Sequence, residues 1–377
     1  MLSLRVFNKK FIHIVRDEKF IDSAYRDFEE AAPNQNVFLI IGLIKKLKFI
    51  KSAKVFFIRP RVLWLFAPLS HFFAKAVIFH SIGSVFEENL LLKINSKTNI
   101  AWISWGYDLF PRLKNIEEYL FPITKGFYNS YSYSNETIND QLNGNFKRSF
   151  KVKPSNIDLI SRINFISPVL KSEFNLLSNS FIIENQKYLR WNYLSLEEDV
   201  ISKNSEINIS GKSLLLGHSG SIWLNHLDGL KELDQLDLEF DQIILPCSYG
   251  DERYISLLKE SLKEKSETIQ LIDHFLPYEE YVKVLEKCKY FLINTERQIG
   301  LGNILFFLYY GGFVVIRKNN PVVEWMSELE IPFTELDSSD FVLVKGGDLE
   351  TKSTLLSFWG KETKRSLTID YLAKIGS

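Results

Sequence analysis

The chain has 377 residues, of which 46% are hydrophobic and 24% charged, and its 46 Lys and Arg residues balance its 46 Asp and Glu residues. This composition is too apolar for a disordered chain, and zero net charge provides no overall field that would attract nucleic acid. Cys247 and Cys288 form no CxxC pattern, which argues against a disulfide framework or a zinc site. The length fits two domains of ordinary size.

The first half of the chain alternates short apolar runs with segments of helical periodicity, which is typical of a parallel sheet with crossover helices. We predict strands at residues 11–15, 37–41, 77–80, 100–104 and 163–166. We predict helices at residues 21–30, 62–74 and 85–92. Residues 126–160 are rich in Asn, Ser and Tyr, and we expect a long excursion with little core there.

After a polar stretch at residues 194–211, the best candidate for a linker, the same alternation restarts. We predict strands at residues 213–216, 242–245, 269–272, 290–293 and 313–316. We predict helices at residues 224–233, 252–262, 278–287, 303–309 and 322–329.

This pattern predicts an α/β protein of two Rossmann-like domains, residues 1–195 and 212–377, that face each other across a cleft. Packing of the last helix back on the first domain stays open. Ligands of open parallel sheets bind at the carboxyl ends of the strands, and the predicted site therefore lies in the cleft.

Two glycine loops in the second half each connect a predicted strand to a predicted helix: GHSGS at residues 217–221 and RQIGLGN at residues 297–303. Free N–H groups at a helix N-terminus bind phosphate, and the guanidinium of Arg297 suits a diphosphate oxygen. Neither loop has the GxxxxGK[ST] pattern of a P-loop. The alternatives are tight turns that need small residues and, for Arg297, a surface arginine paired with Glu296. The candidate binding residues are Gly217, Ser219, Gly220, Asn225, Tyr249, Gln298, Gly300, Gly302 and Asn303.

Polar residues also follow two predicted strands of the first half. Asp108, in ISWGYDLF, is a candidate general base, although an aspartate at this position also fits a helix cap or an Asx-turn. His80 is a candidate substrate contact, and the alternative is a histidine at a strand end with no further role.

The sequence contains no DxD, HExxH or HxH pattern, and we therefore predict no metal site and no cofactor. If a diphosphate leaves, protein N–H groups and Arg297 must stabilise its charge.

Residues 41–75 contain eight Lys or Arg residues and no acidic residue, with aromatic residues among them. This combination fits the surface of an anionic membrane. A solvated basic edge above a core helix is the alternative, and no nucleic-acid-binding motif accompanies the basic residues.

Several of these stretches resemble the dTDP-N-acetylfucosamine:lipid-linked disaccharide transferases of enterobacterial common antigen synthesis. The resemblance covers roughly residues 11–337 and is densest at 214–325, and its most specific pieces are RQxGxG at 297–302 and WGxDL at 105–109. It implies the GT-B glycosyltransferase fold and a metal-independent enzyme that is peripheral on the cytoplasmic face of the bacterial inner membrane.

On this resemblance we expect transfer of a deoxy-aminosugar from a dTDP-sugar to a polyprenyl-diphosphate-linked glycan. The expected partners are these two substrates and an anionic membrane surface, with no nucleic acid. Gly217, Ser219 and Gly220 would present N–H groups to the diphosphate, and Arg297 and Gln298 would bind the same oxygens. Asp108 would accept the acceptor's proton if the reaction inverts configuration and would position the sugar if it retains it. A sugar-nucleotide epimerase of the same fold and a non-catalytic glycan-assembly protein stay open as alternatives.

Overall fold

The computed structural model describes residues 10–130, 155–181, 183–201, 207–236, 238–265 and 267–377. The chain divides into two compact units. The first unit comprises Met1–Leu113, Ser134–Tyr193 and Glu362–Ser377, and the second comprises Lys114–Tyr133 and Leu194–Lys361. Among the helices that the structure describes, none combines the length and the apolar character needed to span a bilayer.

The first unit is built on a parallel sheet with the strand order β3-β2-β1-β4-β5-β6-β7. Its strands are β1 (Phe11–Val15), β2 (Asn36–Ile41), β3 (Val55–Ile58), β4 (Ala76–Phe79), β5 (Asn99–Ile103), β6 (Phe165–Ser167) and β7 (Lys187–Tyr188). The order reverses between β1 and β4, which is the switch point where doubly wound sheets bind ligands.

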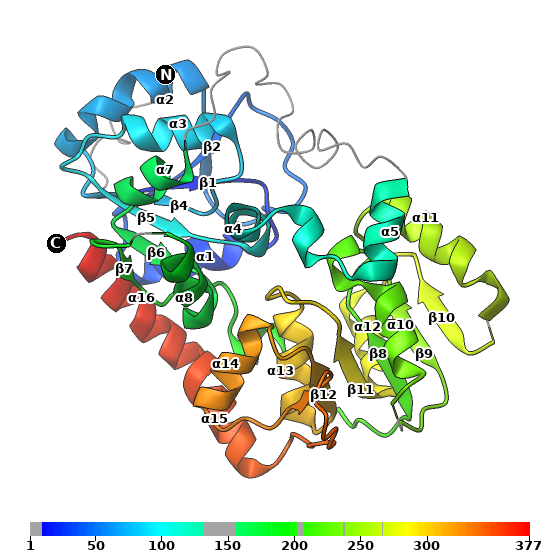
Figure 1. Ribbon diagram of the computed structural model, residues 1–377. Coiled ribbons are helices and arrows are strands. Elements are labelled where there is room, and N and C mark those ends of the chain that lie inside the picture. Colours follow the sequence, from blue (N-terminus) through cyan, green and yellow to red (C-terminus); the bar gives the residue numbers. More distant parts are fainter. Residues whose placement is uncertain (1–9, 131–154, 182, 202–206, 237, 266) are drawn as a thin grey trace. The chain divides into compact units, whose positions relative to one another are not determined.

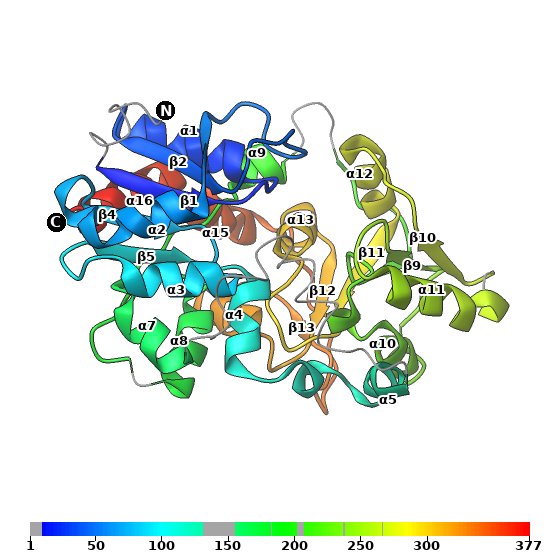
Figure 2. The same ribbon diagram turned by 90° about the horizontal axis from the view of Figure 1, so that it is seen from above.

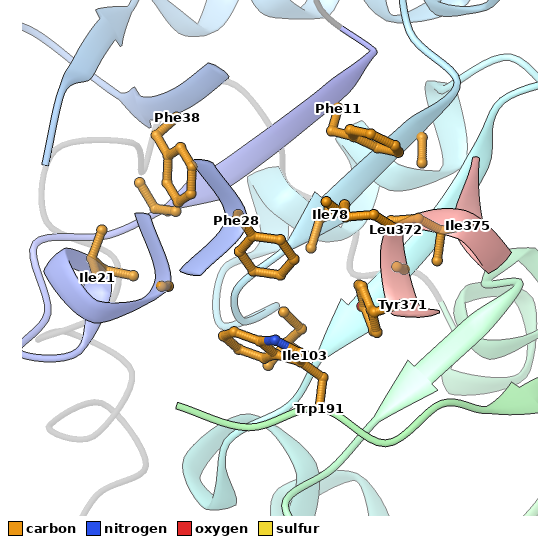
Figure 3. Close-up of a cluster of buried hydrophobic side chains, with 14 of the residues drawn as sticks. Phe11, Ile21, Phe28, Phe38, Ile78, Ile103, Trp191, Tyr371, Leu372 and Ile375 are labelled. Atoms are coloured by element: carbon orange, nitrogen blue, oxygen red, sulfur yellow. The ribbon is translucent and has the colours of Figure 1, made fainter. Parts of the chain in front are cut away.

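Side chains along β1 alternate between two covered faces of this sheet, as the period of two residues requires. Phe11 and Val15 face a cluster that includes Phe28 of α1 (Ile21–Ala31) and Tyr371 of α16 (Lys361–Ile375), and Figure 3 shows how these rings meet. The opposite face lies under α2 (Pro60–Phe66), the 3₁₀ helix η2 (Ala67–Phe72) and α3 (Val85–Lys93). The remaining helices of this unit are α4 (Gly106–Leu113), α7 (Asn156–Arg162) and α8 (Lys171–Ser180).

The second unit repeats the plan in a sheet with the strand order β10-β9-β8-β11-β12-β13, again parallel throughout. Its strands are β8 (Ser213–Leu216), β9 (Ile243–Pro246), β10 (Ile269–Ile272), β11 (Cys288–Ile293), β12 (Phe313–Ile316) and β13 (Thr334–Glu335). Its helices are η3 (Ile116–Tyr119), α5 (Pro122–Ser130), α9 (Leu196–Asp199), η4 (Ile222–Leu224), α10 (His226–Leu233), α11 (Glu252–Ser261), η5 (Lys263–Lys265), α12 (Tyr278–Glu286), α13 (Leu301–Tyr310), α14 (Pro321–Glu328) and α15 (Leu349–Trp359). The switch point of this sheet lies between β8 and β11.

Segment α5 comes from the first half of the sequence but packs on α10 in the second unit (Figures 1 and 2). The buried carboxylate of Asp228 on α10 accepts hydrogen bonds from the N–H groups of Ile123 and Thr124 and from the Thr124 hydroxyl. The last helix, α16, belongs mainly to the first unit, where Tyr371 is fully buried. Each unit is therefore built from more than one segment of the chain, and a single boundary between residues 195 and 212 does not separate them.

The predicted strands and helices lie within a few residues of those observed, with instructive differences. The predicted helix at 62–74 is instead α2 followed by η2, because Pro68 lacks the N–H that an α-helix would use there. The structure adds β3, whose alternating half-exposed pattern marks an edge strand. Most of the predicted excursion at 126–160 lies outside the described residues.

Candidate functional site

The two glycine loops of the second unit meet at its switch point. The first loop follows β8 and the second follows β11, which is the neighbouring strand in the sheet. A Cβ atom placed on Gly300 would lie 2.9 Å from Nδ1 of His218, so the imidazole packs directly against the backbone of the second loop. The structure therefore brings together two loops that are about eighty residues apart in sequence, as parallel β-α topology requires.

The N–H groups of Gly217 and Gly220 do not point to a ligand, which corrects the predicted role of both glycines. The Gly217 N–H donates to the Leu292 carbonyl at 2.9 Å, and the Gly220 N–H donates to the Tyr249 carbonyl at 2.7 Å. Gly217 instead supplies a positive φ of 68°, and a Cβ on Gly220 would lie 2.2 Å from the Ile255 side chain. Both positions need glycine for backbone geometry and close packing.

The start of α13 offers the better anion site. Gly300 is its N-cap residue at φ 75°, and no side chain caps the helix there. A Cβ on Gly302 would meet no atom of the described residues within 4 Å, so these residues leave the space beside the first turn open. Asn303 is held by a hydrogen bond of 2.7 Å from its Nδ2 to the Tyr281 hydroxyl. N–H groups in an uncapped first turn, aided by the helix dipole, attract phosphate oxygens.

Arg297 is a buried residue, with 4% of its surface exposed, which is incompatible with the alternative of a surface arginine. Its Cζ lies 4.3 Å from the ring centre of Trp223 and 5.6 Å from that of Tyr119. Glu296 instead pairs with Lys114 and Asn319. The two rings hold the guanidinium in a fixed plane through cation–π attraction. Sequence reasoning missed both aromatic partners, and Tyr119 could not be found from local spacing because it lies in the segment that crosses into the second unit.

Two rings border the first loop. The ring centres of His218 and Tyr249 are 6.4 Å apart in an edge-on arrangement, and Tyr249 is 53% exposed. Burial lowers the pKa of His218 to about 4, so the imidazole is neutral near pH 7. Nδ1 of His218 is buried and has no hydrogen-bond partner within the described structure. A half-exposed tyrosine beside a neutral histidine can stack on a base or sugar ring and donate a hydrogen bond.

Asn225 is a scaffold residue rather than an exposed ligand contact. Asn225 is fully buried, and its Oδ1 accepts from the Phe121 N–H at 2.9 Å. Its Nδ2 donates to the carbonyls of Tyr119, Trp223 and Asn294. Asn225 thus joins the segment that carries Tyr119 to the loop that carries Trp223, and Ser219 is 2% exposed.

The first unit has a partly buried ion pair at its own switch point, and sequence reasoning missed its arginine. Arg16 follows β1 and pairs with Glu87, which lies on the helix after β4. Their bidentate contacts are 3.1 Å from Nε to Oε1 and 2.5 Å from a terminal nitrogen to Oε2. The Gly83 N–H also donates to Oε2 of Glu87, at 3.0 Å. Arg16 keeps 23% of its side chain exposed, whereas Glu87 keeps 7%.

Asp108 lies close to this pair, but its carboxylate is engaged by the protein. Oδ2 accepts from the Ile82 N–H at 2.6 Å and from the Trp102 indole at 2.8 Å, and Oδ1 accepts from the Trp105 N–H at 2.7 Å. Burial raises the pKa of Asp108 to about 6, although these donors oppose the increase. With 4% exposure, the carboxylate joins the loops that follow β4 and β5. This geometry favours the cap interpretation over the general base.

His80 is buried at 3% exposure and contacts only protein groups through its ring nitrogens. One nitrogen lies 2.9 Å from His13 and the other lies 2.8 Å from the Tyr193 hydroxyl. The indole N–H of Trp105 donates to the same hydroxyl at 3.3 Å. His80 is therefore linked to Trp105 of the WGxDL motif through the Tyr193 hydroxyl, and both of its ring nitrogens are engaged by protein groups.

Within the described ranges, no cluster of three or more His, Cys, Asp or Glu side chains could hold a metal ion. Two glutamates of the first unit form ion pairs with arginines: Glu87 with Arg16 and Glu88 with Arg112.

The resemblance seen in the sequence is confirmed over the segment that carries the two glycine loops. Residues 189–345 match the sequence model of the family described as 4-alpha-L-fucosyltransferase glycosyl transferase group 56. This segment contains β8 to β13 and both glycine loops of the second unit.

Solved structures confirm the predicted GT-B fold across the whole chain. A glycosyltransferase from Rickettsia africae ESF-5 is 11% identical with a TM-score of 0.58, and the match covers 98% of this chain and 99% of that one. The apo form of the lipopolysaccharide outer core galactosyltransferase WaaB is 9% identical with a TM-score of 0.57, covering 97% and 99%. Anabaena Alr3699/HepE in complex with UDP and glucose is 8% identical with a TM-score of 0.51, covering 97% and 94%. The family match and the fold together support a glycosyltransferase.

Proposed function

We propose that this chain transfers a deoxy-aminosugar from a dTDP-sugar to a polyprenyl-diphosphate-linked glycan, as a metal-independent enzyme at the cytoplasmic face of the bacterial inner membrane. The observation that carries the donor side of this proposal is the uncapped first turn of α13, which lies at the switch point within the matched family segment. A protein of the same fold, Anabaena Alr3699/HepE, has been solved in complex with UDP and glucose.

The proposed donor site uses both loops of the second unit. The diphosphate binds the N–H groups of Leu301 and Gly302 in the first turn of α13, since the Asn303 N–H donates to the Gly300 carbonyl. Arg297 and Gln298 supply charge and a hydrogen bond. Asn303, held by Tyr281, borders the same turn. Tyr249 and His218 contact the nucleoside or the sugar.

The chemistry breaks the bond between the anomeric carbon and the diphosphate oxygen while the acceptor oxygen forms the new bond and gives up its proton to the leaving diphosphate or, in the general-base alternative, to Asp108. Negative charge builds on the leaving diphosphate, and groups that are already oriented toward it stabilise the transition state more than the ground state. Trp223 and Tyr119 orient Arg297 before the reaction begins. Asp108 is proposed as a positioning residue that organises the loops around Arg16 and Glu87, with the general-base role as the tested alternative.

The first unit carries the surface that we propose for the membrane. Its exposed apolar side chains include Leu43 at 72%, Ile44 at 87% and Phe72 at 75%. These residues belong to the stretch 41–75, which contains basic but no acidic residues. Apolar side chains interspersed with lysines suit the headgroup region of an anionic bilayer.

A nucleotide panel followed by a transfer assay tests this function. A thermal-shift series with dTDP, UDP, GDP and CMP should show the largest stabilisation with dTDP, and at 100 times the dissociation constant it amounts to about 2.7 kcal/mol. Transfer should require a lipid-linked glycan and should survive excess EDTA. Conversion of the nucleotide sugar without an acceptor would indicate an epimerase, and binding without turnover would indicate a non-catalytic assembly protein. Activity lost with EDTA and restored by Mg²⁺ would contradict metal independence.

A further inference from the structure

The first unit contains an apolar cavity that the proposed catalytic chemistry does not use. Its volume is about 180 Å³, and it lies between the sheet face opposite α1 and the segment formed by α2 and η2. Its floor includes Ile12, Ile14 and Leu39, and its roof includes Val62, Leu63 and Phe66.

The lining offers nothing to a polar ligand. Ser70 is the polar residue among those that border the cavity, and its hydroxyl shares a hydrogen bond of 2.8 Å with the Thr98 hydroxyl. An apolar cavity of about 150 Å³ stays dry and takes up apolar molecules. The cavity therefore suits a hydrocarbon group.

The roof helix α2 is rich in apolar residues but buries little of their surface. Helix α2 reads PRVLWLF, yet none of its residues is fully buried. Leu65 on its outer side is 70% exposed, and Leu69 and Phe72 of η2 are 45% and 75% exposed. Apolar side chains on a helix are normally buried in a core or in a membrane, whereas this roof has them both toward the cavity and toward the outside.

Basic residues flank the roof. Arg59 and Arg61 are exposed at the start of α2, and Lys75 is exposed after η2. Nζ of Lys93 lies 4.5 Å from the ring centre of Trp64 on α2. Positive charge beside an apolar cavity matches a molecule with an anionic head and a hydrocarbon tail.

We propose that this cavity binds part of the hydrocarbon chain of a phosphate-bearing lipid, which enters as α2 and η2 shift away from the sheet. The inference deepens the proposed function and rests on its lipid-linked acceptor. An isoprenoid chain of the acceptor and an acyl chain of the bilayer share the required chemistry, and the experiment distinguishes them. A lipid whose hydrocarbon chain lies in the cavity would have its phosphate near the arginines of α2.

The test measures binding of farnesyl phosphate, dodecyl phosphate and inorganic phosphate by calorimetry. The variant Ala67→Leu fills the cavity from η2, since Ala67 is 4% exposed and lines it. Ala373→Leu is the matched control, because Ala373 is exposed on α16 and lies outside the cavity lining. We expect Ala67→Leu to weaken farnesyl phosphate binding at least about tenfold, as loss of a few buried methylene contacts implies, while Ala373→Leu binds as the wild type does.

The three ligands separate the outcomes. Preference for farnesyl over dodecyl phosphate assigns the cavity to the isoprenoid acceptor, and equal binding assigns it to hydrocarbon chains in general. Equal binding of inorganic phosphate, or unchanged farnesyl phosphate binding in folded Ala67→Leu, overturns the proposal. If Ala67→Leu does not fold, Val62→Phe fills the same space from the roof. Stabilisation by dTDP and sugar transfer are measured on the wild type, so failure of the proposed function is visible independently of tail binding.

Discussion

His80 donates a hydrogen bond from Nε2 to Nδ1 of His13 across 2.9 Å, and both rings are buried in the first unit. The amide of Asn36 sets this direction, because its Nδ2 donates to two carbonyls and leaves Oδ1 to accept from Nε2 of His13 at 3.1 Å. His13 must then accept at Nδ1, and His80 must accept at Nδ1 from Tyr193. Each imidazole is therefore held neutral in one tautomer.

Because both histidines are held neutral in the folded protein, we predict that the protein loses stability in acid. Burial lowers the pKa of His13 to about 3, although its hydrogen bond to Asn36 opposes the shift, and burial with the neighbouring His13 lowers that of His80. The unfolded state binds more protons at these histidines below their ordinary pKa of 6.5, so their contribution is complete above that pH and is lost as the pH falls toward 3.

Urea unfolding at several values between pH 7.5 and 4.5 measures this effect. The decline in the free energy of unfolding should be smaller in His80→Gln than in the wild type. An equal pH dependence in His80→Gln and the wild type would contradict a neutral buried His80.

Asp108→Asn should lower both stability and activity. An amide cannot accept at both oxygen positions, so its NH₂ group would face either the Trp105 N–H or the donors of Ile82 and Trp102. The raised pKa of about 6 makes the native state bind the additional proton between about pH 4 and 6. The wild type's advantage over Asp108→Asn in unfolding free energy should therefore shrink as the pH rises through that window.

Kinetics distinguish the two roles of Asp108. A positioning role predicts that the residual kcat of Asp108→Asn keeps the wild-type pH profile while the unfolding temperature falls. A general base predicts a kcat lowered by about 100- to 10,000-fold and a pH profile of kcat that differs from that of the wild type. The second result would restore Asp108 to the catalytic residues.

Arg297→Ala should lower turnover on the order of 100-fold, since a charged donor to the leaving group would be lost. Arg297→Lys should recover only part of the activity, because a point charge lacks the planar fork that stacks on Trp223. Arg253→Ala removes an exposed arginine from α11 of the same unit and should keep full activity. Wild-type turnover in a folded Arg297→Ala variant would remove Arg297 from the site.

Gly302→Ala and Gly300→Ala should separate nucleotide binding from folding. A Cβ at residue 302 meets open space within a helix, so stability should hold or rise by up to about 1 kcal/mol, while dTDP affinity falls at least about tenfold because the methyl occupies the diphosphate position. At Gly300 the positive φ and the contact with His218 should lower the unfolding free energy by about 1–2 kcal/mol. Unchanged dTDP affinity in Gly302→Ala, measured by calorimetry, would place the diphosphate elsewhere.

Charge reversal should release the protein from anionic liposomes without changing dTDP affinity. The test variant changes four exposed lysines of the stretch 41–75 to Glu: Lys45, Lys46, Lys48 and Lys51. Each lysine near an anionic surface contributes about 1 kcal/mol. The control variant makes the same change at four exposed lysines of the second unit: Lys231, Lys263, Lys283 and Lys287.

Co-sedimentation with anionic liposomes at low and high salt tests this prediction. Binding should weaken at high salt, because salt screens the electrostatic attraction over about 8–10 Å. The loop that carries the substituted lysines should keep its backbone conformation. The Asp17 carboxylate accepts hydrogen bonds from the backbone N–H groups of Lys48, Phe49 and Ile50, and these bonds do not depend on the lysine side chains. Equal release of both variants would indicate a general charge effect rather than a specific membrane surface.

The order of strands and helices could be predicted from the sequence because it depends on local information. Apolar runs such as residues 213–216 and 313–316 coincide with the observed strands β8 and β12. Alternation of β and α segments then dictates parallel sheets, and glycine loops after β8 and β11 mark the switch point. The motif around Arg297 was visible for the same reason, since its loop and helix are contiguous.

Only the tertiary structure decided what the residues of these motifs do. Tyr119 reaches Arg297 because the chain crosses early into the second unit, and the bond between Phe121 and Asn225 fixes that crossing. The N–H groups of Gly217 and Gly220 became unavailable through contacts with Leu292 and Tyr249 from other strands and loops. Hydrogen-bond saturation and burial depend on neighbours that are distant in sequence, and local periodicity contains no record of them.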